Sequence, residues 1–429
     1  MAERMTRPTI EPLDRMPVVA YLTDVEGQWE KLTSFTDDNP CVTLDAEGRL
    51  DVAEGAVLVF GGDAIDRGPS SRRVVAALLE ANLRQPDQVI LLAGNRDINK
   101  TRLPRELGGH PPRSAPPEVL ASSRADLLQW IFRNTMGAAP AFEHRRAELT
   151  SEGRAPQDDP GASDDAVVQS FLDDLAPGGA LTRYLAACQL AYRSGATLFV
   201  HGGVTDENFG EVPGEDPRTL DVDVWIARLN AFYATQIGAY VARALDASGR
   251  PGWAEIVAYQ APLPGSRLNQ KSVVYARPTD DIGNPYLPSR LVIDALRGSG
   301  ITRVVVGHTP NGDTPSVLRD DGFELVIADN SYGRVDGASK VFLRGDALVV
   351  EASAALDDGA RVDLIFQTPV DDSSPLGKRD ADTGHLVTGR LASGEFLLFR
   401  CLEGYRIEQI PASAADLATR RLTAPHRAR

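Results

Sequence analysis

Five short apolar runs, each ending in glycine or polar residues, most strongly constrain how this chain folds. They span residues 17–23, 56–60, 88–92, 197–200 and 302–306. Their length and their content of β-branched residues and leucine favour buried strands. The clearest helical patterns, at 71–83, 119–132 and 222–245, lie between them. Alternating strands and helices predict an α/β fold with a mainly parallel or mixed sheet flanked by helices.

The residues that follow these runs are the ligand types that divalent cations prefer. Asp24 and Glu26 follow the first run, Asp63 the second, Asn95 the third, and His201 and His308 the last two. Strand ends of this kind bring distant segments to one sheet edge, so we expect the side chains to cluster. Singly, each has a structural explanation as a helix cap, a turn residue or a hydrogen-bonded histidine. As an ordered set, they predict a metal site.

Two cations about 3.5 to 4 Å apart need a bridging carboxylate, and a water held between them becomes hydroxide near neutral pH. Asp63 is the natural bridge. Asp24 and Glu26, two residues apart in an extended segment, would complete the first site. Asn95, His201 and His308 would complete the second.

This set resembles the calcineurin-like metallophosphoesterases, which include the PPP-type serine/threonine phosphatases and the diadenosine tetraphosphatases. Their motifs are Asp-x-His-Gly, Gly-Asp-x-x-Asp-Arg-Gly, Gly-Asn-His-Glu/Asp and two separated histidines, and the match covers roughly residues 18–333. The resemblance implies a four-layer α/β/β/α sandwich of two mixed sheets. It also implies hydrolysis of a phosphate ester or phosphoanhydride by hydroxide held between two ions, with Arg67 binding phosphate.

Two residues depart from the family pattern. Glu26 replaces the histidine of the first motif, and an all-carboxylate first site favours Mn²⁺, with Mg²⁺ or iron as alternatives, over Zn²⁺. Arg96 replaces the histidine of Gly-Asn-His, which in the family is thought to protonate the leaving group. Arginine stays charged and cannot be that acid. By the resemblance, Asp66 is placed to pair with Arg96, so Asp66, Arg67 and Arg96 form the predicted catalytic set, and both arginines are predicted to bind the phosphate.

Without a positioned acid, we expect phosphoanhydrides or aryl phosphates to be preferred over alkyl phosphates, unless Asp97 or a residue of the inserts supplies the proton. A small phosphorylated molecule or nucleotide is the expected substrate, because large inserts would narrow access. Two alternatives remain open from the sequence. One is a serine/threonine protein phosphatase, and the other is a pseudophosphatase that acts as a binding module.

Composition argues against nucleic-acid binding, a membrane span, and disulfide or thiolate metal sites. The formal net charge of −15 disfavours binding to nucleic-acid backbones. No stretch approaches the roughly 18 unbroken apolar residues of a membrane span, and the first residues lack a secretory pattern, so we expect a cytoplasmic protein. Three widely spaced cysteines favour neither disulfides nor a thiolate metal site.

The organisation predicted from these patterns places a tail at 1–16, a metallophosphoesterase domain at 17–335, a C-terminal β extension at 336–411 and a second tail at 412–429. Polar stretches rich in proline or glycine at 104–118, 151–165 and 262–289 predict loops. Within the domain we expect a helical insertion at about 103–193 and a possible lid loop at 262–289. The triplet Asp329, Asn330 and Ser331 follows a predicted strand and is a candidate for supporting the site.

Overall fold

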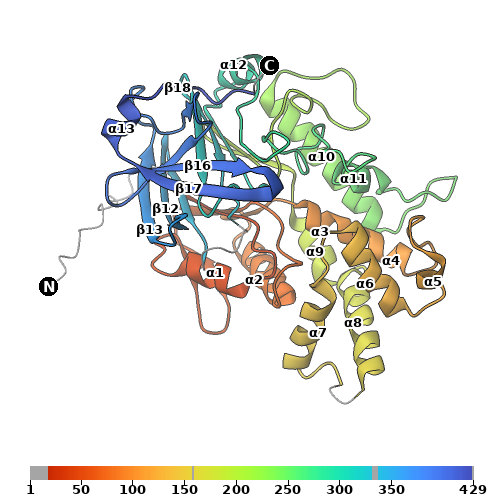
Figure 1. Ribbon diagram of the computed structural model, residues 1–429. Coiled ribbons are helices and arrows are strands. Elements are labelled where there is room, and N and C mark those ends of the chain that lie inside the picture. The colour runs from red at the N-terminus through yellow and green to blue at the C-terminus, as the bar shows by residue number, and fades with distance from the viewer. Residues whose placement is uncertain (1–17, 157–158, 331–336, 428–429) are drawn as a thin grey trace.

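The computed structural model describes residues 18–156, 159–330 and 337–427, and the predicted tail at 1–16 and Ser331 lie outside them. The described residues form an α/β fold with two mixed sheets, which confirms the predicted fold class. Figure 1 shows the sheets on one side and helices α4 to α8 projecting away from them on the other. No helix in these ranges has the length and apolar character to cross a membrane.

The first sheet has six strands in the order β13-β12-β11-β1-β4-β5. Their bounds are β1 Val18–Leu22, β4 Ala56–Phe60, β5 Val89–Leu91, β11 Lys340–Arg344, β12 Ala347–Ala355 and β13 Arg361–Thr368. Strands β1, β4 and β5 are parallel neighbours, whereas β11 pairs antiparallel with β1 and begins an antiparallel meander. The strands just after residue 336 therefore extend this sheet.

The second sheet has five strands in the order β6-β7-β8-β10-β9. Their bounds are β6 Ala191–Ser194, β7 Thr197–Val200, β8 Arg303–Val306, β9 Ser316–Asp320 and β10 Phe323–Ile327. Strands β7, β8 and β10 are parallel. All five apolar runs of the sequence are thus strands, and the last two share this sheet.

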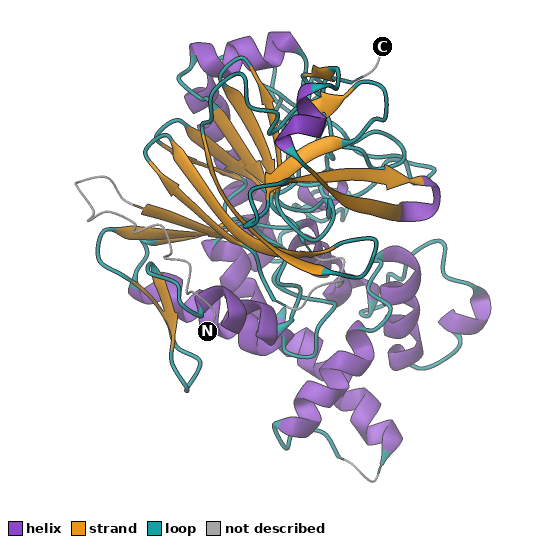
Figure 2. Ribbon diagram, turned by 60° about the vertical axis from the view of Figure 1, so that its left-hand side comes forward, coloured by secondary structure: helices purple, strands orange, loops and turns teal. Residues whose placement is uncertain are grey.

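The two sheets pack face to face. Val19 and Tyr21 of β1 belong to one apolar core together with Phe199 and Val305 of the second sheet, and the Tyr21 and Phe199 rings stack at 5.6 Å. Alternate residues such as Ala20 belong instead to the core that includes the helices. This alternation is why the runs are apolar throughout. Figure 2 shows helices on both outer sides of the stacked sheets.

A third sheet closes one end of the core between the first two. Its order is β17-β16-β15-β14-β18. Its strands are β14 Arg379–Asp380, β15 Leu386–Arg390, β16 Phe396–Leu402, β17 Arg406–Ala412 and β18 Leu422–Thr423, and a separate hairpin joins β2 Val42–Leu44 and β3 Leu50–Val52. The segment predicted as a second tail, from 412 onward, contains helix α13 Ala414–Ala418 and strand β18, which pairs with β14.

The described α-helices lie between these strands along the chain. They are α1 Trp29–Thr36, α2 Ser71–Arg84, α3 Asn95–Asn99, α4 Leu103–Glu106, α5 Pro117–Leu120, α6 Arg124–Thr135, α7 Ala141–Ser151, α8 Pro160–Asp174, α9 Ala180–Ala187, α10 Val222–Val241, α11 Ala254–Tyr259, α12 Arg290–Gly298 and α13 Ala414–Ala418. Helices α3 to α9 all lie between β5 and β6, and α4 to α9 fall within the range of about 103–193 where the sequence predicted a helical insertion.

Three prolines that favoured loops in the sequence instead begin helices. Pro104, Pro117 and Pro160 stand in the first turns of α4, α5 and α8. Proline is favoured there because its missing N–H is not needed for helix hydrogen bonds. The loop predictions at 104–118 and 151–165 are therefore wrong in part, whereas 262–289 contains no named helix or strand.

The single helix predicted over 119–132 is interrupted. Ser123 accepts a hydrogen bond from the backbone N–H of Asp126, and the Asp126 side chain accepts one from the backbone N–H of Ser123. This capping box starts α6 at Arg124 and separates it from α5. The helical spacing of apolar residues continues across the break between α5 and α6, so the sequence pattern alone did not reveal it.

Candidate metal and phosphate site

The predicted site residues come together at the carboxyl ends of both parallel strand groups. Asp24 lies two residues beyond β1, Asp63 three beyond β4, and His308 two beyond β8. Because the ends of β1 and β4 face those of β7 and β8 across the sandwich, side chains from both sheets meet at one place. The expected clustering is therefore present in the structure.

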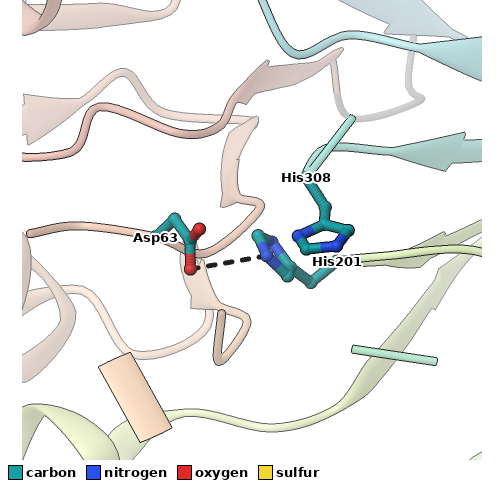
Figure 3. A group of neighbouring side chains, drawn as sticks. All are labelled: Asp63, His201 and His308. Carbon is teal, nitrogen blue, oxygen red and sulfur yellow. Dashed lines mark ion pairs between the residues drawn. The ribbon is translucent and has the colours of Figure 1, made fainter. Parts of the chain in front are cut away.

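Asp63, His201 and His308 form the centre of the site. One ligand atom from each lies within 4.8 Å of the other two, and all three residues are buried. His201 Nε2 lies 3.4 Å from Asp63 Oδ1 and 3.2 Å from Asn95 Oδ1. Figure 3 shows both imidazoles turned toward the Asp63 side of the site. Two imidazoles, a carboxylate and an amide oxygen are a donor set that suits a divalent transition-metal ion, so these residues fit the metal that the sequence predicts.

Other groups hold both histidines in place. His201 Nδ1 lies 2.8 Å from the carbonyl oxygen of Gly61, which leaves Nε2 to face Asp63 and Asn95. Fixing the outer nitrogen in this way orients the inner one as a ligand. Arg277 Nε lies 3.4 Å from His308 Nε2, and the Tyr275 ring contacts the His308 ring.

The surroundings of the two histidines shift their pKa values in opposite directions. Burial lowers the pKa of His201, but the Asp63 carboxylate outweighs it and the net pKa rises to about 10. Burial, with the Arg277 charge second, holds the pKa of His308 well below its usual range. Without an ion, Asp63 and His201 therefore form a charged pair, whereas His308 stays neutral.

Asp97 supports the backbone of the site. Its carboxylate accepts hydrogen bonds from the backbone N–H groups of Asp63 (3.0 Å), Ala64 (2.9 Å) and Gly94 (3.0 Å). Burial and the Asp63 charge raise the Asp97 pKa to about 7, while the N–H groups of Gly94 and Ala64 act in the opposite sense. Since its oxygens are used in this way, Asp97 ties two strand ends together and is a poor candidate for the missing acid.

Asp24 is similarly occupied by structural contacts. Its Oδ2 accepts hydrogen bonds from the backbone N–H of His308 (2.9 Å) and from Thr23 Oγ1 (2.6 Å). Lys31 Nζ donates to the Asp24 carbonyl at 2.8 Å. Burial, followed by the Asp329 charge, raises the Asp24 pKa well above its usual range. Asp329, two residues beyond β10, therefore contributes to the electrostatics of the site. Asp24, Asp63 and Asp329 all line one cavity, which is described below.

The backbone at the site is unusual. Four of the six predicted metal ligands have positive φ angles: Asp24 (51°), Glu26 (53°), Asp63 (56°) and His308 (63°). Non-glycine residues adopt this region seldom and at a cost, and such residues concentrate at functional sites. The clustering supports a functional role for these turns.

Arg96 and Arg67 both reach the Glu26 carboxylate. Arg96 Nε lies 2.7 Å from Glu26 Oε1 and 3.4 Å from Asp63 Oδ2. Arg67 Nε lies 3.4 Å from Glu26 Oε1, and its side chain is 42% exposed. Burial raises the Glu26 pKa to about 7 although both guanidinium groups oppose the rise.

The closest cationic partner of Asp66 is Lys100 rather than Arg96. Lys100 Nζ donates to Asp66 Oδ2 at 2.6 Å, whereas Arg96 Nη1 is 3.9 Å from the same oxygen. Lys100 and Asn99 are both buried. Lys100 stands four residues after Arg96 and donates to its carbonyl oxygen at 3.0 Å. A spacing of four residues puts both side chains on one face of a helix, a signal that the sequence prediction did not use.

A cavity of about 510 Å³ opens onto these residues. Five arginines from separate segments line it: Arg67, Arg96, Arg102, Arg133 and Arg277. The end of α6 contributes one wall, which the sequence did not predict. The long loop at 262–289 contributes Tyr275 and Arg277 to the lining of the cavity.

Gly94 is required for the close approach of two strand ends. A Cβ at this position would overlap the backbone nitrogen and the carboxylate of Asp63. We expect Gly94→Ala to lower the free energy of unfolding by about 1–3 kcal/mol and to weaken metal binding. Gly238→Ala, on an exposed face of α10 where a Cβ meets nothing within 4 Å, is the matched control. It is expected to raise the free energy of unfolding by about 0.5–1 kcal/mol, measured by urea denaturation. An unchanged Gly94→Ala protein would contradict the described packing.

No family model and no curated protein matches this sequence. Among solved structures, similarity is found to a cold-active protein-tyrosine phosphatase of a psychrophilic Shewanella species, with 18% identity, 81% of this chain and 80% of that chain covered, and a TM-score of 0.45. A protein serine/threonine phosphatase of Saccharomyces cerevisiae has 13% identity, coverage of 83% and 82%, and a TM-score of 0.32. A metallophosphoesterase from Sphaerobacter thermophilus has 11% identity, coverage of 83% and 89%, and a TM-score of 0.29. The function is therefore inferred from the geometry of the site itself.

Proposed function

We propose that this protein is a metal-dependent phosphoesterase of the calcineurin-like type that hydrolyses a small phosphorylated molecule or nucleotide. The observation that carries the proposal is the convergence of Asp63, His201 and His308, with Asn95 beside His201, at strand ends from both sheets. These four side chains would hold the ion. When bound, such an ion supplies Lewis acidity and makes a water nucleophilic near neutral pH.

The arginines of the cavity account for recognition of phosphate. In a chain with a net charge of −15, this cavity gathers five guanidinium groups, although Asp24, Glu26, Asp63 and Asp329 line it as well. Arginine binds phosphate oxygens in a bidentate manner and remains charged at any physiological pH. We assign phosphate binding beside the ion to Arg67, which is 42% exposed, and to Arg277, which contacts His308. Arg102 and Arg133 suit further anionic groups of the substrate.

The dimensions of the cavity favour a small molecule over a phosphoprotein. It is lined by residues 133–137, which include the end of α6, and also by residues 260–262, Tyr275 and Arg277. A volume of about 510 Å³ matches ligands of nucleotide size. Closure of the loop at 262–289 over a bound substrate is part of this proposal.

The test is a hydrolysis panel in Mn²⁺, Mg²⁺ or a chelator. It contains p-nitrophenyl phosphate, ATP, a dinucleoside polyphosphate, a sugar phosphate and a phosphopeptide. We expect turnover of the small substrates that the chelator abolishes. Fastest turnover of the phosphopeptide would favour the protein phosphatase instead. Bound metal without turnover of any substrate would favour the pseudophosphatase, for which the replacement of an acid by Arg96 is the motivating observation.

A further inference from the structure

A guanidinium group lies where the first of two ions would have to bind. An ion shared by Glu26 and Asp63 must sit between their carboxylates, as the sequence analysis expected. In the structure Arg96 Nε is in that position, 2.7 Å from Glu26 Oε1 and 3.4 Å from Asp63 Oδ2. A fixed cation and a divalent ion repel each other strongly at such separations in a buried site.

Several contacts hold Arg96 there. Its backbone N–H donates to Asp63 Oδ1 at 2.9 Å, which fixes the start of the side chain beside the site. Its Nη1 donates to the carbonyl oxygen of Gly137 at 3.3 Å and lies 3.9 Å from Asp66 Oδ2. The side chain is only 12% exposed. The guanidinium is therefore anchored at three sides and does not point into open solvent.

The ligand atoms of the site also converge on one position only. Over the described ranges, Asp63, His201 and His308 are the one group of three such side chains with ligand atoms within 4.8 Å of one another. Asp24, predicted for the first ion, instead directs Oδ2 to the His308 backbone N–H and to Thr23. Glu26 Oε1 already faces two guanidinium groups, those of Arg96 and Arg67.

We propose that this site binds one divalent ion and that the Arg96 guanidinium takes the place of the second. The inference rests on the proposed function and specifies its chemistry. Asp63, Asn95, His201 and His308 would hold the ion, and its charge together with the Arg96 cation would neutralise the phosphate. Arg96 would supply a fixed positive charge beside Glu26 and Asp63 where a second ion would supply coordination positions. The predicted pair of ions is thereby reduced to one.

The test is metal content, which does not depend on turnover. Protein equilibrated with Mn²⁺ and freed of excess by gel filtration is analysed for manganese per chain, and its EPR spectrum is recorded. We expect one Mn²⁺ per chain in the parent, with a spectrum that lacks exchange coupling. Arg96→Met is expected to bind two, with coupling between them, because the carboxylates of Glu26 and Asp63 lose their cation. Arg96→Lys retains a charge and is expected to bind one, as is Arg133→Met, an exposed arginine of the same cavity.

The outcomes separate this inference from the proposed function. Two ions in the parent would overturn the inference and leave the phosphoesterase intact. No ion in the parent would overturn both. One ion in Arg96→Met as well as in the parent, with circular dichroism unchanged, would overturn the role given to Arg96. If Arg96→Met does not fold, the parent's stoichiometry and EPR spectrum decide between one ion and two.

Discussion

Asp63→Asn is expected to lower the turnover number by at least about 10³-fold and to remove the bound ion. Asp63 is the carboxylate that faces His201 at 3.4 Å and Arg96 at 3.4 Å, so its charge stabilises both the ion and the arginine. Asparagine has the same shape and tolerates the positive φ of 56° at this position, so the backbone is preserved. The change therefore tests charge and ligation rather than folding.

Steady-state kinetics on p-nitrophenyl phosphate with Mn²⁺, together with metal analysis, measure this effect. Asp87→Asn, in the exposed turn before β5, is the matched control and is expected to retain the parental rate and metal content. An Asp63→Asn protein that keeps more than a tenth of the parental activity would contradict the role of Asp63 as the central ligand.

The second large effect concerns the leaving group. Because Arg96 cannot donate a proton and Asp97 is engaged by three backbone N–H groups, neither residue protonates a departing alkoxide. Alkyl phosphates are therefore expected to react about 10² to 10⁴ times more slowly than aryl phosphates or phosphoanhydrides, beyond their intrinsic difference. Arg96→His places an acid at this position and is expected to recover much of the alkyl rate.

The measurement is kcat/KM across phosphate esters whose leaving groups span a wide range of pKa. A steep fall with rising leaving-group pKa is expected for the parent and a shallow one for Arg96→His. Arg133→His, which places an imidazole elsewhere in the cavity, is expected to keep the steep dependence. Equal slopes for the parent and Arg96→His would show that the acid comes from another source.

The strands and the site's location were predictable because both are set by local patterns. Apolar runs that end in Asp, Asn or His identify strand ends, and parallel strands bring those ends together. Helix boundaries were less predictable because the same residue type can stand in a loop or at the start of a helix. Pro104, Pro117 and Pro160 resemble loop residues but begin helices, and Ser123 interrupts an otherwise continuous apolar pattern.

The detailed contacts of the site were not accessible from the sequence, because they join segments that no pattern connects. The contact of Arg96 with the Gly137 carbonyl depends on how α6 packs against the strand ends. That of Arg277 with His308 depends on the path of a long loop. The sequence assigned Asp66 to Arg96, whereas the buried Lys100 is its closer partner. Motif spacing thus identified the groups but not which cation pairs with which carboxylate.

The proposed ion site is tested most directly by anomalous diffraction from a crystal of this protein grown with Mn²⁺, recorded on both sides of the manganese absorption edge. We expect an anomalous peak at bonding distance from Asp63, Asn95, His201 and His308. Absence of a peak among these four side chains, or a peak at another place only, would contradict it.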